Sequence, residues 1–213
     1  MLPFTSAQFF EVFAVYNNAI WPVQIVAYGL GALTVTTLFW PGDTVDRITT
    51  AVLALMWVWS GIAYHWLQFS SVNPAAWVFG VAFVLQGAIF LVVGTLQSRM
   101  RFGLTSHLSS FTGFAFILYA GVIYPFFGIS LGDSYPRAPM FGVTPCPVAI
   151  FTFGWMLLLK AAIQWWVIAI PVLWSLIGGT AAFLLDVPQD WLLLVGGVMT
   201  ALLLATSRKL SFR

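Results

Sequence analysis

The chain has 213 residues, of which 61% are hydrophobic, 17% aromatic and only 7% charged. A soluble domain carries about 25% charged residues, so this chain lacks the polar surface that a water-soluble fold of its size needs. Its net charge of +2 comes from residues near the ends of apolar runs, which excludes a nucleic-acid-binding patch. We therefore predict an all-α integral membrane protein whose main partner is the lipid bilayer.

The first predicted element is a short helix over residues 5–16. Thr5 and Gln8 have the spacing of a capping box. One face of this helix carries three aromatic residues, Phe9, Phe13 and Tyr16. An amphipathic helix of this kind is expected to lie on the outer leaflet, ahead of the first membrane span.

Seven predominantly apolar runs then follow, each near the length of about 20 residues that crosses the hydrocarbon core. The fifth is the weakest, because Lys160 follows a short apolar stretch, and Pro171 offers the alternative of one longer, broken helix. The predicted spans are 18–40, 48–69, 74–97, 108–131, 147–162, 165–185 and 189–206.

The distribution of basic residues predicts the orientation of these seven spans. Cytoplasmic loops collect Lys and Arg, and an extracytoplasmic N-terminus leaves only Arg137 outside. Without the fifth span, the basic residues near the C-terminus would fall outside. The C-terminus is therefore predicted to be cytoplasmic, with these residues inside: Arg47, Arg99, Arg101, Lys160, Arg208, Lys209 and Arg213.

Small residues along the predicted spans indicate close helix packing. Gly80, Gly87 and Gly94 recur every seven residues and form one stripe of the third span. The stripe favours packing within the chain, and a homo-oligomer formed through such faces is the alternative. No linker or repeat divides the chain, so a single domain over 1–213 is predicted.

Polar side chains are concentrated at the predicted extracytoplasmic end. Polar groups within a membrane need a partner or a water-filled cavity, and they often mark a substrate pathway. A substrate site is therefore predicted from residues of several spans and of the loop 133–147, which its prolines and glycines should keep ordered. This loop is either a lid or a seal over helix ends. The predicted site residues are Tyr64, His65, Asn73, Gln86, Tyr124, Tyr135 and Arg137, with Gln24 deeper in the bundle.

His65, Met140 and Cys146 supply the imidazole, thioether and thiol that soft metals prefer, so copper or zinc is one prediction for this region. The set lacks a dense ligand motif, and the alternatives are a structural histidine and an inert cysteine. No other cofactor is predicted. Enzyme motifs such as GxSxG or HExxH are absent, which favours a function other than catalysis.

Three segments carry a family resemblance: YNNAIWPVQ at 16–24, NPAAWVFGVAFVLQG at 73–87 and YPRAPMFGVTPCPVAIFTFG at 135–154. Together they resemble an uncharacterised family of bacterial multi-pass membrane proteins, a domain of unknown function. The resemblance implies the bacterial inner membrane as the location. It implies no activity and no catalytic residue.

Three functions are consistent with these observations. The first is a permease or channel for a small solute or ion, with its polar site near the extracytoplasmic face. The second is a non-catalytic accessory or sensor subunit, which requires the stripe of Gly80, Gly87 and Gly94 to face lipid or another chain. The third is a metal-handling protein or membrane enzyme, which requires His65 and Cys146 to share one ligand.

Overall fold

The computed structural model describes residues 3–40, 42–130, 134–207 and 209–211, and most of them are helical. The N-terminal half contains the helices α1 (Ser6–Ala19), α2 (Val23–Thr37), α3 (Asp43–Trp59), η1 (Ser60–Trp66), η2 (Phe69–Ser71), α4 (Ala76–Ile89) and η3 (Phe90–Leu96). The C-terminal half contains α5 (His107–Leu118), η4 (Tyr119–Ile123), α6 (Tyr124–Ser130), α7 (Pro145–Leu157), β1 (Ile163–Gln164), α8 (Trp166–Leu185), η5 (Pro188–Asp190), α9 (Trp191–Thr206) and β2 (Leu210–Ser211). The predicted all-α class is confirmed.

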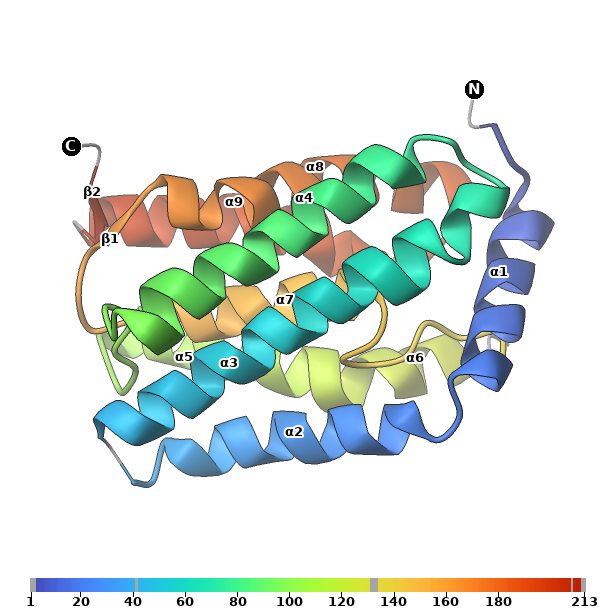
Figure 1. The fold of residues 1–213 in the computed structure, drawn as a ribbon. Helices are drawn as coiled ribbons and strands as arrows, with labels where there is room; N and C mark the ends of the chain where they lie inside the picture. The colour runs from blue at the N-terminus through green and yellow to red at the C-terminus, as the bar shows by residue number, and fades with distance from the viewer. Residues whose placement is uncertain (1–2, 41, 131–133, 208, 212–213) are drawn as a thin grey trace.

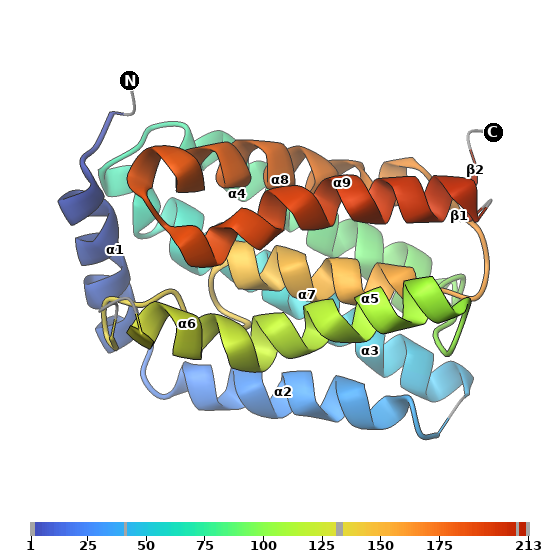
Figure 2. The ribbon, with the colours of Figure 1, turned by 180° about the vertical axis from the view of Figure 1, so that it is seen from behind.

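The long helices form a bundle with α7 in its middle and α1 lying across one end (Figures 1 and 2). At the opposite end β1 and β2 form a short parallel pair, in which Ile163 faces Leu210. We call these two ends the α1 end and the basic end. A membrane protein of this shape presents its two ends to the two aqueous phases and its sides to lipid.

Helix α7 forms the core of the bundle. Every residue of Pro145–Leu157 is buried except Cys146, which is half-buried. Helices α3, α5, α8 and α9 all pack against it, and the indole of Trp57 donates a hydrogen bond of 2.9 Å to the Thr152 hydroxyl. Because α7 is surrounded by protein, its length of about 20 Å need not match the roughly 30 Å of hydrocarbon.

Among the described residues, five helical segments are long and apolar enough to cross a membrane: Asp43–Ser71, Ala76–Leu96, His107–Ser130, Trp166–Leu185 and Pro188–Thr206. They coincide with five of the seven predicted spans. The predicted first span corresponds to α2, which meets the same criterion only together with α1, across a bend of 88°. The predicted fifth span corresponds to the shorter helix α7.

Helix α1 begins as the sequence predicts and packs differently from the expectation. Thr5 and Gln8 form the capping box. The aromatic face of α1 contacts protein, with Phe13 stacked on Tyr64 at a ring-centroid distance of 5.3 Å and Tyr16 only 1% exposed. The helix therefore covers the end of the bundle, because its aromatic side chains find a protein surface there.

The glycine stripe packs within the chain. A methyl group added at Gly80 would overlap the ring of Trp66, and one added at Gly87 or Gly94 would overlap Val58 or Thr50. The stripe lets α4 and η3 approach α3 and η1 closely. This is the packing that the spacing indicates, and a homo-oligomer stays a prediction.

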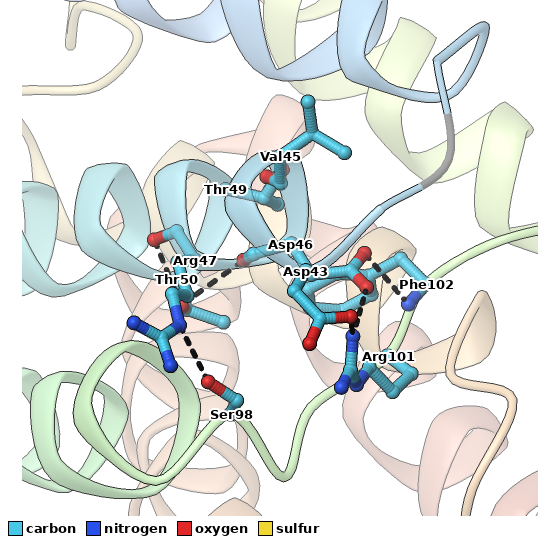
Figure 3. Close-up of polar contacts among 9 residues, drawn as sticks. All are labelled: Asp43, Val45, Asp46, Arg47, Thr49, Thr50, Ser98, Arg101 and Phe102. Atoms are coloured by element: carbon cyan, nitrogen blue, oxygen red, sulfur yellow. Dashed lines mark hydrogen bonds and ion pairs between the residues drawn. The ribbon is translucent and has the colours of Figure 1, made fainter.

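The basic end holds a network of paired charges (Figure 3). The Arg101 guanidinium forms an ion pair with Asp43 and lies 3.7 Å from the Asp46 carboxylate. The backbone N–H of Phe102 donates to the same Asp46 side chain at 3.1 Å, and Arg47 donates to the Ser98 hydroxyl at 2.5 Å. These bonds tie the start of α3 to the segment after η3.

The C-terminal segment joins the basic end from the opposite side. Lys209 donates to the carbonyl of Leu159, and its partial burial lowers the pKa of its ammonium group. Arg208 and Arg213, which the orientation prediction also uses, lie outside the described residues, as does residue 133 of the outer loop.

Candidate functional site

A cavity of about 450 Å³ lies inside the α1 end of the bundle. Its wall is formed by α1, by η1, η2 and the start of α4, by the segment 139–146, and by the second half of α8 with η5. These segments are far apart in sequence and meet at this end because the long helices run side by side (Figures 1 and 2). The cavity is therefore a product of the whole fold.

Aromatic rings form most of one side of the cavity. Several pack on one another: Phe4 and Phe69 lie edge to face with centroids 5.3 Å apart, and Tyr64 stacks on Phe69 at 5.6 Å. Such contacts hold the rings in fixed orientations. The aromatic lining consists of Phe4, Phe9, Phe13, Tyr64, Phe69, Phe79 and Trp174.

The carboxyl group of Asp190 is the one acidic group of this wall, and the side chain is 3% exposed. It accepts a hydrogen bond of 2.5 Å from the Tyr124 hydroxyl, and the Cys146 thiol is hydrogen-bonded to the same carboxyl. The ion pairs found among the described residues all involve Arg101, at the other end of the molecule. Asp190 is thus a buried acid with neutral partners only.

Breaks in regular helix geometry position these groups. Tyr64 and His65 lie on the π-helix η1, whose turns are wider than those of an α-helix. The π-helix η4 ends at Ile123, directly before Tyr124. Pro188 opens the short helix η5, which carries Asp190 to the first turn of α9. Cys146 lies in the first turn of α7, where Pro145 fits because that position needs no N–H donor.

The loop before α7 is buried from Ala138 to Thr144, except for Met140, which is half-buried. The Asn17 side-chain amide donates to the carbonyls of Pro136 and Ala138, at 2.6 and 2.8 Å. The Tyr16 hydroxyl donates to the carbonyl of Val143 at 2.7 Å and accepts from the Trp59 indole at 2.8 Å. The loop is therefore fastened to α1, and it supplies Pro139 and Thr144 to the cavity wall.

His65 lies next to the cavity wall and does not reach the cavity. Its ring is surrounded by aromatic side chains, with centroids 4.7 Å from Phe83 and 5.2 Å from Trp174, and Trp174 itself lines the cavity. The side chain is fully buried, and neither ring nitrogen has a hydrogen-bond partner among the described residues. Burial without a partner is costly for an imidazole.

The structure brings together part of the predicted substrate site. Tyr64, Asn73 and Cys146 line the cavity, and Tyr124 reaches it through Asp190. Gln86 is buried deeper, where its amide donates to the Val167 carbonyl at 2.9 Å. The loop residues lie elsewhere: Arg137 is exposed, and Tyr135 bonds the Asn17 carbonyl at 3.3 Å.

The predicted metal ligands are not gathered into one cluster. Met140 packs with the apolar residues under α1, Cys146 bonds Asp190, and His65 lies behind Trp174. In the described part of the chain no three His, Cys, Asp or Glu side chains gather around one point. Copper or zinc binding stays a prediction.

Sequence reasoning missed Asp190 and Trp174. Asp190 directly precedes an apolar run, where an acid usually caps a helix at the membrane surface, and Trp174 lies within an apolar run. A usable signal was that the apolar segment of the last span, Pro188–Thr206, includes Asp190 near its start. Only the fold shows that the two residues share a cavity.

Long apolar helices whose sides carry exposed apolar residues, such as Val78 at 69% and Phe111 at 75%, are the features of a multi-helix membrane protein. The chain belongs to a family of unknown function, DUF6064, whose model matches residues 6–213. No curated protein and no solved structure matches the chain. The predicted membership of an uncharacterised family is confirmed, and the function must be argued from the site.

Proposed function

We propose that this protein binds a small, mainly apolar molecule from the membrane in the cavity at its α1 end. The observation that carries the proposal is the cavity itself, which has the volume of a small-ligand site, an apolar and aromatic wall, and a few convergent polar groups. A pocket of this composition suits a ligand that is poorly soluble in water.

Access from the side of the bundle supports a ligand that comes from the bilayer. Three lining residues of α8 are themselves exposed: Leu176 at 43%, Ile177 at 47% and Leu184 at 66%. The cavity therefore reaches the surface along α8, on a flank that carries apolar side chains. A ligand dissolved in lipid meets this opening without crossing water.

We propose the orientation and location that the sequence predicts, with seven crossings in which α2 and α7 serve as the short members. Among the described residues, Arg137 is the basic side chain placed at the α1 end, while Arg47, Arg101 and Lys209 are bonded within the basic end. By the positive-inside rule, this distribution supports an extracytoplasmic position for the cavity. The family resemblance supports the bacterial inner membrane.

A permease is the second candidate, favoured by buried polar atoms that continue inward from the cavity. His65 contacts Trp174, and Ser60 on η1 and Gln86 on α4 are also buried. The His65 ring nitrogens, the Ser60 hydroxyl and the Gln86 side-chain carbonyl have no hydrogen-bond partner among the described residues. Polar groups in this position often mark a pathway. Uptake of the bound molecule into liposomes, slowed by Gln86→Leu without weaker binding, would support transport.

Binding is tested with an apolar probe that carries a quencher, 1-bromo-4-neopentylbenzene, on protein purified in uncharged maltoside micelles. We expect saturable quenching of tryptophan fluorescence, because Trp174 forms part of the wall. Ala181→Phe fills the cavity and should abolish the saturable phase. Ala169→Phe, on the same helix, half-buried and away from the cavity, should retain it. Equal quenching in both variants would refute the site.

A further inference from the structure

We propose that the molecule bound in this cavity is a hydrophobic organic cation, with its ammonium group beside Asp190 and among the aromatic rings. This inference rests on the proposed function and names the chemical class of the ligand. Three observations support it: the negative charge of the site, its aromatic wall and the small number of groups that could bind an inorganic cation.

Among the described residues, the charge of the site comes from one group. Those that line the cavity include Asp190 and no Lys, Arg or His. Its hydrogen-bond partners, Tyr124 and Cys146, are neutral donors. A buried carboxylate is stable only when it is paired or neutralised, and an organic cation would supply the missing countercharge. An anion would meet only repulsion.

The wall fits the remainder of such a ligand. Faces of aromatic rings attract quaternary and tertiary ammonium groups, which have weakly hydrated, apolar surfaces. Four of the lining rings come from three helices: Phe9 and Phe13 from α1, Phe79 from α4 and Trp174 from α8. An aliphatic pocket would bind the apolar part of the ligand equally well, but it would not attract the ammonium group.

A small inorganic cation fits this site less well. Hard cations need six or more oxygen ligands, and soft metals need clustered nitrogen or sulfur ligands. The cavity offers the Asp190 carboxylate and a few separated hydroxyl, amide and thiol groups on an otherwise apolar wall. A cation that carries its own apolar shell is the one that this wall can solvate.

The test compares two probes of nearly the same shape, 4-bromobenzyltrimethylammonium and the neutral 1-bromo-4-neopentylbenzene, by saturable tryptophan quenching in maltoside micelles. We expect the wild-type protein to bind the cation at least about tenfold more tightly than the neutral probe, and Asp190→Asn to bring the ratio of the two affinities close to one. Asp186→Asn is the matched control, because Asp186 is exposed and lies outside the cavity.

A second variant keeps the test informative if Asp190→Asn does not fold. Phe9→Leu keeps an apolar side chain and removes one ring of the wall, so it should lower the preference for the cation over the neutral probe about threefold. Phe10→Leu, on the same helix and outside the lining, should leave this preference unchanged.

The outcomes separate the inference from the proposed function. Equal affinities for both probes in the wild type, or a cation preference that survives Asp190→Asn, would overturn the inference while the cavity remains a binding site. Absence of saturable binding for both probes would overturn the proposed function, and the inference with it.

Discussion

The two ends of the bundle treat buried charge in opposite ways. At the basic end the Asp46 carboxylate has a guanidinium within 4 Å and a backbone donor (Figure 3). At the α1 end Asp190 is more deeply buried and, among the described residues, has only neutral donors; the ring nitrogens of His65, in the same half of the bundle, have no hydrogen-bond partner there. Paired charges stabilise a fold, whereas unpaired polar groups cost stability and are kept where function needs them. The difference supports our proposal that the α1 end carries the function.

The largest effect is expected from breaking the pairing at the basic end. Arg101→Ala should lower the free energy of unfolding by about 2 kcal/mol, because Asp46 loses its nearest cation in a partly solvated site. Unfolding in dodecyl sulfate titrations measures the change. Arg99 is an exposed neighbour, so Arg99→Ala should lower the free energy of unfolding much less. Equal losses in the two variants would show that the ion pairs do not stabilise the fold.

The next effect concerns the hydrogen bonds that fasten α1 and the outer loop. Tyr16→Phe should destabilise the protein by about 1–1.5 kcal/mol, because the buried Val143 carbonyl and Trp59 indole both lose a partner. Proteolysis of the loop 134–144 should become faster. Tyr28→Phe serves as the control, since its hydroxyl bonds no described residue, and loop cleavage that is faster there as well would speak against this account.

A change of opposite sign is expected at Asp190. In ligand-free protein, Asp190→Asn should raise the free energy of unfolding by about 1 kcal/mol, since a buried unpaired charge is removed and the amide oxygen still accepts from Tyr124. The same titration gives the value. A loss of stability comparable to that of Arg101→Ala would make Asp190 a structural residue.

His65→Phe tests whether the buried imidazole also lowers the stability of the α1 end. The phenyl ring fits the surrounding aromatic side chains and has no nitrogen to satisfy, so we expect a gain of about 1 kcal/mol in the free energy of unfolding. Elemental analysis belongs to the same experiment. Stoichiometric copper or zinc in the wild type, lost in the variant, would instead make His65 a metal ligand.

The smallest effect is expected at the start of α1. Thr5→Ala removes an exposed capping box and should cost about 0.5 kcal/mol of local stability. Amide hydrogen exchange over residues 6–9 should become faster, while exchange in α9 should not change. Unchanged exchange in α1 would mean that the aromatic contacts of α1 alone hold this helix against the bundle.

Hydropathy predicted the long spans because lipid imposes a length and a composition on a helix that faces it. It overestimated the lengths of the spans at α2 and α7. The bend between Ala19 and Val23 and the burial of α7 inside the bundle depend on packing, which hydropathy does not describe. Some residues at the candidate site were named from the sequence: Tyr64, Asn73 and Tyr124 for their polarity at one end, and Cys146 as a metal ligand. Asp190 and Trp174 were missed, because chain order does not say which helices are neighbours.

The enclosure of α7 bears on how the protein is made. A helix of 13 residues is too short to anchor itself across a bilayer, and its ends would leave backbone groups in hydrocarbon. Two of the helices that enclose it, α8 and α9, follow it in the chain. We therefore expect α7 to reach its final position only after α9 has been translated. A chain that stops after Leu157 should then fail to fold and be degraded.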